Sequence, residues 1–296
     1  MYPSEFEYFA PRTIDEAIEL LGRYGDDAKV LAGGQSLVPM MKLRIASPRY
    51  LIDINRIEGL GGVRRDGDRL MIGALCRHAD ILESALVRDV LPIMTDAAGH
   101  TADIQVRNRG TVAGSLAHAD PAGDWPAVLA ALDTTVTVAG PSGSRTIPLA
   151  GFIVDAYTTQ LEPGEILVGL SVGIPPKPSG GAYVKFEKRA GDFAVASVAV
   201  QIELDGETCR HVAISLGALG PTAIRAASAE QALQGHDLSE ERLAAAARLV
   251  SEAADPFADT RGSVEYKRHL AGVLFRRAFA AALDRARGRD VAMPHV

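Results

Sequence analysis

Apolar and polar positions follow two different periods in the N-terminal part of the chain. After Thr13, which opens a Thr-x-x-Glu capping box, apolar residues recur at helical spacing over residues 14–21, and Gly25 stands where that helix should stop. The segment KVLA (29–32) has the length and composition of a short strand. It runs into two glycines and then into an apolar segment over residues 37–43. The pattern predicts a strand, a glycine turn and a short helix.

The middle of the chain carries more strand-like and helical segments. Residues 78–101 are predicted to be helical with a break at Pro92, because proline ends or kinks a helix. Small and polar residues dominate from Gly110 to Asp124, which predicts loop or tight turns. Asp124 is also a candidate N-cap for a helix over residues 125–132. The predicted strands cover residues 50–54, 69–75, 134–140 and 165–174.

The stretch PPKPSGGA (175–182) is the best candidate linker, because proline and glycine leave it little to bury. Beyond it, strand-like segments precede helical ones, and Asp205-Gly206 offers a hairpin turn. Strands followed by helices indicate an α+β unit. We therefore expect one domain over residues 1–176 and a second over 177–290. The strands of the second domain are predicted at 183–189, 194–204 and 211–219, and its helices at about 226–234, 239–254 and 264–287.

Composition and charge narrow the class of protein. With 296 residues, of which 47% are hydrophobic and 23% charged, the chain has an ordinary globular composition and is long enough for two packed units. Its net charge of −6 argues against nucleic acid as the main partner, although a local basic patch can still bind a small anion. The first residues lack a signal-peptide pattern, and no apolar run is long enough to cross a membrane. We expect a cytoplasmic protein, with peripheral attachment at the inner face of the membrane left open.

The two cysteines, Cys76 and Cys209, are far apart and form no CxxC pair. They cannot hold an iron–sulfur cluster or a structural zinc ion unaided. We therefore expect no metal site in this chain, and any metal chemistry must come from another one.

The first candidate site is the loop AGGQS (32–36), between the predicted strand and the predicted short helix. Gly33 and Gly34 allow backbone conformations closed to other residues and bring N–H groups close to a ligand. A helix beginning near Ser36 adds unpaired N–H donors and the positive end of the helix dipole, which suit phosphate oxygens. The alternative is a plain turn with Ser36 as N-cap. The loop is neither a GxGxxG fingerprint nor a P-loop, and GLGG (59–62) is interpreted as a turn.

The second candidate site lies in the small-residue segment that starts at Val106 and runs to Pro126. Crowded small residues let a backbone lie flat against a rigid ligand. The hydroxyls of Thr111 and Ser115 and the carboxylates of Asp120 and Asp124 could bind the hydroxyls of a sugar-like chain. Each residue also has a structural interpretation, such as Asp124 acting as an N-cap.

These segments resemble the FAD-binding medium subunits of the molybdenum hydroxylase family. The likeness is strongest to the carbon monoxide dehydrogenase branch and runs almost from end to end. The run Val-Arg-Asn-Arg-Gly-Thr joined to His-x-Asp-Pro-x-x-Asp is long and specific, whereas AGGQS alone is weak evidence. The resemblance is carried by AGGQSL (32–37), IGALCRHADI (72–81), VRNRGTVAGSLAHADPAGDWPA (106–127), KFEKRAGDFAVASVAV (185–200) and RGSVEYKRHLAGVLFRRA (261–278).

The resemblance implies a vanillyl-alcohol-oxidase-like FAD domain in two parts, about 1–57 and 58–176, followed by a smaller α+β domain of antiparallel strands and helices. It implies that both loops wrap the FAD diphosphate and its flanking sugars. Gly34→Val is then expected to push a side chain into the phosphate space. Asp124 would bind a cofactor hydroxyl, Leu167 would lie near the adenine, Lys185 near the polar flavin end and Phe193 near the isoalloxazine. The implied FAD-binding residues are Ala32, Gly33, Gly34, Gln35, Ser36, Thr111, Val112, Ala113, Gly114, Ser115, Asp124, Leu167, Lys185 and Phe193.

Two of these residues also have plain structural interpretations, and the second loop departs from the family pattern. Phe193 could be a core residue at a strand end, and Lys185 could be a solvated strand lysine. The loop contains TVAGS where relatives often have Thr-Ile-Gly-Gly-Asn, so a side-chain contact is in doubt there, but a cradle made of backbone is not.

By this likeness the chain is an oxidoreductase subunit that transfers electrons through FAD and has no catalytic acid or base of its own. Its partners would be a small subunit with [2Fe–2S] clusters and a large subunit with the molybdenum cofactor, assembled as a dimer of heterotrimers. Electrons would pass from the clusters through FAD to an external acceptor. The alternative is a stand-alone FAD-dependent oxidoreductase, which would need a substrate-binding insertion with acid and base residues, and none is visible.

Overall fold

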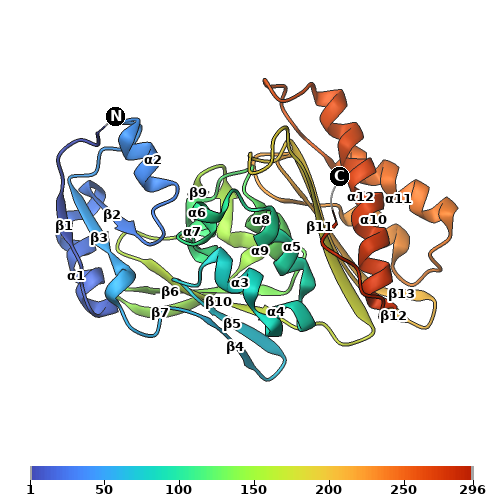
Figure 1. Cartoon of the computed structure of the whole chain (residues 1–296), viewed down its shortest axis with the longest axis horizontal. Helices are drawn as coiled ribbons and strands as arrows, with labels where there is room; N and C mark the ends of the chain where they lie inside the picture. The colour runs from blue at the N-terminus through green and yellow to red at the C-terminus, as the bar shows by residue number, and fades with distance from the viewer. Residues whose placement is uncertain (1, 295–296) are drawn as a thin grey trace.

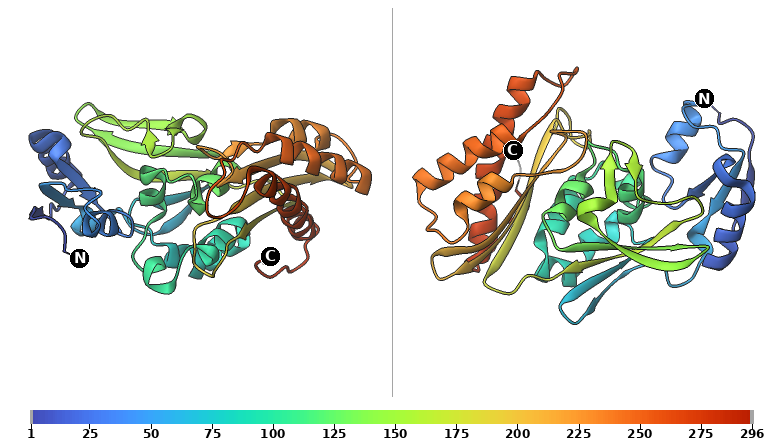
Figure 2. Two further views of the ribbon diagram at one scale, coloured as in Figure 1. Left: turned by 90° about the horizontal axis from the view of Figure 1, so that it is seen from above. Right: turned by 180° about the vertical axis from the view of Figure 1, so that it is seen from behind.

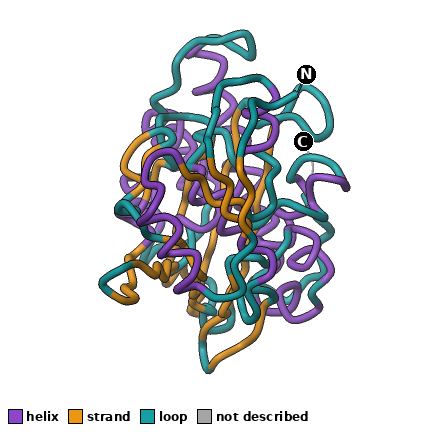
Figure 3. The backbone as a smooth tube through the Cα atoms, turned by 90° about the vertical axis from the view of Figure 1, so that its left-hand side faces the viewer, coloured by secondary structure: helices purple, strands orange, loops and turns teal. Residues whose placement is uncertain are grey.

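The structure, a computed structural model, describes residues 2–294 and contains three main sheets in a row along the longest dimension of the molecule (Figure 1). Each sheet has helices packed against it, and the buried hydrophobic residues fall into three clusters. We refer to an N-terminal, a middle and a C-terminal unit. The α+β class predicted from the sequence is confirmed. Seen from the end where the N-terminal unit lies, helices flank the strands (Figure 3).

The N-terminal unit is a small parallel sheet with two helices. Its strands, in sheet order, are β1 (Glu7–Phe9), β3 (Tyr50–Asp53) and β2 (Ala28–Leu31); its helices are α1 (Ile14–Tyr24) and α2 (Leu37–Lys42), with 3₁₀ turns at Gly25–Asp27 and Ile54–Arg56. Helix α1 buries Ala17 against Ile52 and Ile54. Helix α2 stands on the side that faces the middle unit (Figure 1).

Helix α1 shows how closely a capping signal fixes local structure. The hydroxyl of Thr13 accepts the N–H of Glu16 at 3.2 Å, and Gly25, with φ of +53°, ends the helix. The Glu16 carboxylate accepts the N–H of Arg12 at 2.8 Å. The reciprocal bond of the predicted capping box is therefore displaced by one residue.

The middle unit is an antiparallel sheet covered by short helices. Its strands, in sheet order, are β4 (Val63–Asp66), β5 (Arg69–Gly73), β10 (Ile166–Gly173), β6 (Thr134–Gly140) and β7 (Gly143–Pro148). Its helices are α3 (His78–Glu83), α4 (Ala85–Val90), α5 (Pro92–His100), α6 (Ile104–Arg107), α7 (Val112–His118), α8 (Asp124–Ala130) and α9 (Leu149–Phe152), and β8 (Ile153–Asp155) pairs with β9 (Thr158–Thr159). Alternate strand residues such as Leu70, Ile72, Val136 and Val138 pack against the helices in one core.

The prediction of loop and tight turns over residues 110–124 was wrong for half of that segment. Residues Val112–His118 form helix α7, which Thr111 caps by accepting the N–H of Gly114 at 3.0 Å. Val112 and Leu116 are fully buried, so tertiary packing overrides the weak helix propensity of the small residues.

The predicted helical stretch over 78–101 is broken twice. Pro92 begins α5 at a first-turn position, as the break predicted there requires. Ser84 makes a further break between α3 and α4, where its hydroxyl accepts the N–H of Val87.

The C-terminal unit is an antiparallel sheet with helices on one face. Its strands, in sheet order, are β11 (Ser179–Phe186), β12 (Ala196–Asp205), β13 (Thr208–Gly217) and β14 (Ile224–Arg225); its helices are α10 (Ala227–Leu233), α11 (Glu240–Ala253) and α12 (Val264–Ala286). Asp205 pairs with Thr208 across the predicted hairpin turn, in which Gly206 has φ of +58°. Helix α12 runs along the sheet, while the middle unit lies on the opposite side (Figures 1 and 2).

The predicted linker 175–182 is linker only in its first half, because β11 begins at Ser179. A Cβ at Gly180 would overlap the backbone of Ala282 and Ala286 in α12, and one at Gly181 would lie 3.1 Å from Ile93 in α5. The two glycines therefore let one strand contact a helix of its own unit on one face and the middle unit on the other. The segment therefore has the composition of a linker although its two glycines are tightly packed.

A buried ion pair joins the middle and C-terminal units. The Arg285 guanidinium donates to both carboxylate oxygens of Asp96, at 2.6 and 2.9 Å, and the N–H of Tyr183 donates to the same carboxylate at 3.2 Å. The pair joins α5 to α12 across β11. Among residues 2–294 no helix is long and apolar enough to cross a membrane.

Candidate functional site

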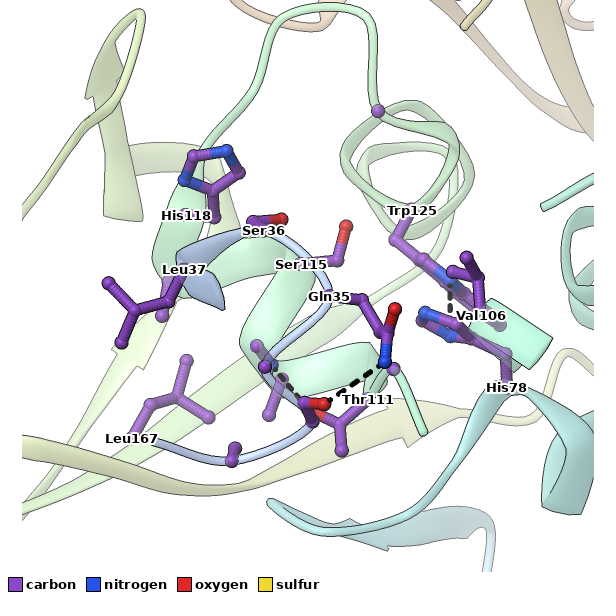
Figure 4. Close-up of a pocket in the computed structure, with 18 of the residues that line it drawn as sticks. Gln35, Ser36, Leu37, His78, Val106, Thr111, Ser115, His118, Trp125 and Leu167 are labelled. Carbon is purple, nitrogen blue, oxygen red and sulfur yellow. Dashed lines mark hydrogen bonds between the residues drawn. The ribbon is translucent and has the colours of Figure 1, made fainter. Parts of the chain in front are cut away.

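A cavity of about 670 Å³ lies between the N-terminal and middle units and reaches the first strand of the C-terminal sheet. This volume lies within the range of about 300–1,000 Å³ that is usual for small-molecule and cofactor sites. Figure 4 shows its lining side chains: Gln35 and Ser36 come from the loop after β2, Thr111 and Ser115 from the start of α7, and Leu167 from β10. All the sequence-predicted site residues line this cavity except Val112, whose side chain is fully buried in the middle core.

The first loop, residues 32–36, is pressed against the second. A Cβ at Gly33 would overlap the carbonyl oxygen of Arg109 and would lie 2.7 Å from the Cα of Gly110. Only a glycine allows this approach of the two backbones. The two glycine-bearing segments, far apart in sequence, thus form one continuous surface.

The start of helix α2 has no side-chain cap. Ser36 stands at the N-cap position, but its hydroxyl makes no capping hydrogen bond, so the interpretation of Ser36 as a simple N-cap is wrong. Gly34 has φ of +73°, and a Cβ there would lie 3.1 Å from Leu31 Cδ1 and 3.2 Å from Val38 Cγ2. The expectation that Gly34→Val fills the phosphate space is therefore wrong, because the side chain would point toward Leu31 and Val38.

The side chains of Asn55 and Arg77 link the two loops through hydrogen bonds. The Asn55 amide donates to the carbonyl of Ala32 at 2.8 Å. The Arg77 guanidinium donates both to the Asn55 side-chain oxygen and to the carbonyl of Arg109. Burial and the nearby Arg109 lower the pKa of Arg77. Asn55 and Arg77 could not be predicted from the sequence, since nothing in the local pattern reveals hydrogen bonds across 22 and 32 positions.

A buried charge cluster closes the far end of the cavity. The Lys185 ammonium lies 3.2 Å from Asp124 Oδ1 and 3.1 Å from Glu187 Oε2, and it donates to the carbonyl of His100 at 3.0 Å. Asp124 also accepts the hydroxyl of Tyr183 at 2.7 Å. The Lys185 side chain is only 1% exposed, so it is not the solvated lysine of the alternative interpretation.

Asp124 does not cap a helix, contrary to one sequence-based interpretation. It is the first residue of α8, Gly123 occupies the cap position, and the carboxylate turns to the charge cluster. Burial raises the pKa of the Asp124 carboxyl, while Lys185 and the Tyr183 hydroxyl oppose that rise. Burial and the neighbouring Asp124 raise the pKa of Tyr183 well above its usual value.

The remaining predicted residues form the walls of the cavity. Leu167 is almost fully buried in β10 at the point where its register against β6 shifts. Phe193 is 52% exposed and lines the cavity, so it is not a core residue at a strand end. Ala113 is buried at the base of α7.

One buried pair at the cavity was not predicted. The indole N–H of Trp125 donates to Nδ1 of His78 at 3.0 Å, and both side chains line the cavity (Figure 4). Burial, with the nearby Arg77 and Arg107, lowers the pKa of His78 to about 4. The segment IGALCRHADI contains His78, but only the resemblance singled it out. Within residues 2–294 there is no cluster of three or more His, Cys, Asp or Glu side chains suited to a metal ion.

The arrangement fits a long ligand with anionic and aromatic parts. The helix start at Ser36 has no side-chain cap, the backbones of the loops meet without intervening side chains, and a buried ammonium and an exposed aromatic ring also line the cavity. Free N–H groups at a helix start favour phosphate oxygens. Here the Val38 N–H donates to the Gly34 carbonyl at 3.0 Å and Pro39 has no N–H, so residues 35–37 would supply them. The residues present therefore fit FAD as the expected cofactor.

Comparison with known proteins agrees with this geometry. Residues 4–177 match the model of the FAD binding domain in molybdopterin dehydrogenase, and residues 181–282 match the model of the CO dehydrogenase flavoprotein C-terminal domain. The chain is similar to the carbon monoxide dehydrogenase medium chain of Hydrogenophaga pseudoflava, with 42% identity over 96% of this chain and 99% of that one. It is also similar to subunit alpha of the 6-hydroxypseudooxynicotine dehydrogenase complex of Paenarthrobacter nicotinovorans, with 40% identity over the full length of both.

The fold is similar to that of a solved structure as well. A chain of the carbon monoxide dehydrogenase from Hydrogenophaga pseudoflava, in a form that lacks the Mo-pyranopterin moiety of the molybdenum cofactor, superposes with a TM-score of 0.94 at 44% identity. The match covers 96% of this chain and 99% of that chain.

Proposed function

The chain belongs to the family of FAD-binding subunits of the molybdopterin dehydrogenases, and we propose that it carries electrons through FAD in a molybdenum hydroxylase complex. The observation that carries the proposal is the joint surface of the two glycine-bearing loops, which lies open to a cavity of cofactor size. FAD, when bound, supplies the exchange of electrons between a donor and an acceptor. The protein contributes a fixed position and a fixed electrostatic environment.

We assign the predicted residues to the cofactor by their places in the cavity. Residues 32–36 and 111–115 hold the diphosphate and the adjoining sugars, with Val112 contributing its backbone alone. Leu167 forms the wall beside the adenine. Lys185 and Phe193 flank the flavin end, where the ammonium is held by the carboxylates of Asp124 and Glu187. Asp124 sets the position of Lys185 and offers a carboxylate to a cofactor hydroxyl.

We propose that its partners are a small subunit with [2Fe–2S] clusters and a large subunit with the molybdenum cofactor, in a dimer of heterotrimers. The names of the relatives support a multi-subunit complex, since one is a medium chain and another a subunit of a dehydrogenase complex. These two relatives have nearly equal identity to this chain and act in the oxidation of different molecules, so we assign no substrate. The proposed domain division is 1–176 and 177–290, with the first domain in two parts that meet near residue 57.

The test is purification of the full chain from its native cell under conditions that preserve complexes. We expect about one FAD per chain, released by denaturation and therefore held without a covalent bond. Trp125 is the one tryptophan in the sequence and lines the cavity, so its fluorescence should rise when the flavin is removed and fall when FAD is restored. Mass spectrometry of the same preparation should identify chains that bind molybdenum and iron–sulfur clusters.

Two outcomes would contradict the proposal. A preparation without flavin that also fails to take up added FAD would overturn the cofactor assignment. A flavoprotein that turns over a substrate with no metal-bearing partner chain would instead establish the stand-alone oxidoreductase.

A further inference from the structure

Glu187 joins the charge cluster to the loop that carries Phe193. It is the first residue after β11 and lies two residues beyond Lys185, with which it forms an ion pair. Its Oε2 lies 3.1 Å from the Lys185 ammonium, and its Oε1 accepts the N–H of Gly191 at 3.2 Å. One carboxylate therefore contacts the cation at the flavin end of the cavity and the backbone of the loop 188–193.

The loop is also seated against the middle unit. Gly191 has φ of +87°, and a Cβ there would lie 3.3 Å from the backbone C and O atoms of Ala102. The Ala102 segment is itself fixed, because the Arg107 guanidinium donates to the carbonyls of Thr101 and Ala102 at 3.0 and 2.9 Å. The loop thus lies against this hydrogen-bonded segment at Gly191, the residue whose N–H Glu187 accepts.

The outer part of the loop contacts the C-terminal unit. The Lys188 ammonium donates to the carbonyl of Thr260 at 2.6 Å, and the Arg261 guanidinium lies 6.0 Å from the centre of the Phe193 ring. Both Lys188 and Phe193 are exposed, and such contacts at the surface contribute little to stability. The partly buried Glu187 is therefore the stronger hold, since a hydrogen bond to a charged acceptor is roughly twice as strong as a neutral one.

We propose that Glu187 is a positioning residue that fixes the loop 188–193, and with it Phe193, at the flavin end of the cavity. The hold depends on Lys185, whose charge keeps the Glu187 carboxylate in place. The role of Phe193 beside a flavin rests on the proposed function, whereas the tether itself does not. The aromatic ring and the ammonium at this end of the cavity are then positioned together.

Hydrogen exchange and proteolysis test the tether directly on the full chain in its purified complex. The readouts are the exchange rate of the Gly191 amide, followed by mass spectrometry, and the rate of tryptic cleavage after the exposed Lys188 and Arg189. In Glu187→Ala we expect both rates to rise about tenfold or more. In Glu187→Gln we expect a smaller rise, because one amide oxygen can still accept from Gly191 while the attraction to Lys185 is lost.

Glu230→Gln controls for general loosening of the chain, and Lys185→Met tests whether the tether depends on its cation. Glu230 makes the same kind of bridge elsewhere, since it accepts the N–H of Ile214 and pairs with Arg225, so Glu230→Gln should leave both rates unchanged. Lys185→Met should also raise the exchange of Gly191, because it removes the attraction that holds the Glu187 carboxylate. Unchanged rates in Glu187→Ala would overturn the tether, and unchanged exchange in Lys185→Met alone would overturn its dependence on the cation.

The flavin content of the same samples separates the two proposals. A wild-type chain that contains no FAD and takes up none when FAD is added would contradict the proposed function, yet the exchange of Gly191 can still be measured there. A wild-type chain with FAD whose Glu187→Ala variant has the same exchange and cleavage rates would contradict the tether alone.

Discussion

Trp125 and His78 form a buried, nearly parallel ring pair, with 17° between the ring planes and 5.6 Å between the centroids. Because the indole N–H donates to Nδ1, the neutral imidazole carries its proton on Nε2. Protonation of Nδ1 would break this bond and place a charge in the core. Protonation of His78 at low pH should therefore disrupt the wall of the cavity that these two rings form.

The pKa of His78, about 4 in the folded chain, predicts a loss of stability in mild acid. The unfolded chain has a histidine pKa of about 6.5, so it binds the proton more readily between pH 6.5 and 4. The contribution of His78 is fully present above pH 6.5 and is lost as the pH falls toward 4, by up to about 3 kcal/mol. We expect the difference in unfolding free energy between the wild type and His78→Gln to shrink over this window. A constant difference from pH 7 to pH 4.5 in urea titrations would contradict the assignment.

The contact between Gly33 and Arg109 predicts that a methyl group added at Gly33 pushes the two loops apart. Gly33→Ala should cost about 1–3 kcal/mol through overpacking, and FAD affinity should fall by about 10- to 100-fold. Gly61→Ala is the matched control, because a Cβ there meets open space. Titration of the flavin-free protein with FAD, followed by Trp125 fluorescence, gives the affinities. Equal affinities of the two variants would show that the loops do not act as one surface.

The burial of Asp124 predicts a large loss of unfolding free energy when the Lys185 ammonium is removed. Lys185→Met leaves a buried carboxylate with the Tyr183 hydroxyl but without its ammonium, and the loss of unfolding free energy should be about 3–5 kcal/mol. Lys185→Met combined with Asp124→Asn should recover part of that loss. Lys42→Met, at an exposed position, should change stability by less than about 0.5 kcal/mol. If Lys185→Met unfolds at the same urea concentration as the wild type, the cluster is not the buried ion pair described.

The packing of Gly180 predicts opposite signs for two glycine substitutions. Gly180→Ala forces β11 and α12 apart and should destabilise the chain by about 1–3 kcal/mol or more. Gly22→Ala, within helix α1 and with no atom near its Cβ, should stabilise it by about 0.4–1 kcal/mol. Thermal unfolding of both variants gives the comparison. A neutral Gly180→Ala would restore the interpretation of residues 179–182 as a linker.

The sequence predicted those parts of the fold that a local period or cap determines. Helix α1, strand β2 and the hairpin at Gly206 lie where periodicity and turn chemistry placed them. Helix α7 was missed because its residues have weak helix propensity, and it exists through the Thr111 cap and the burial of Leu116. Strand β7 was missed because most of its residues are exposed and show no alternation.

The candidate site was predicted unevenly for the same physical reason. The glycines of the first loop could be recognised from the sequence, because their freedom of backbone conformation is a property of the residue itself. The link through Asn55 and Arg77 depends on which strands and helices become neighbours, and no local pattern records that. Phe193 and Lys185 came from the resemblance, and the sequence alone left each with an ordinary structural alternative.

The meeting of Gly33 with the backbone of Arg109 has a consequence for heat stability. The two rims of the cavity belong to the N-terminal and middle units, so any molecule held by both rims also links one unit to the other. By mass action a ligand at a hundred times its dissociation constant adds about 2.7 kcal/mol to the folded state. The melting temperature of this chain should consequently climb with the concentration of the molecule that fills the cavity.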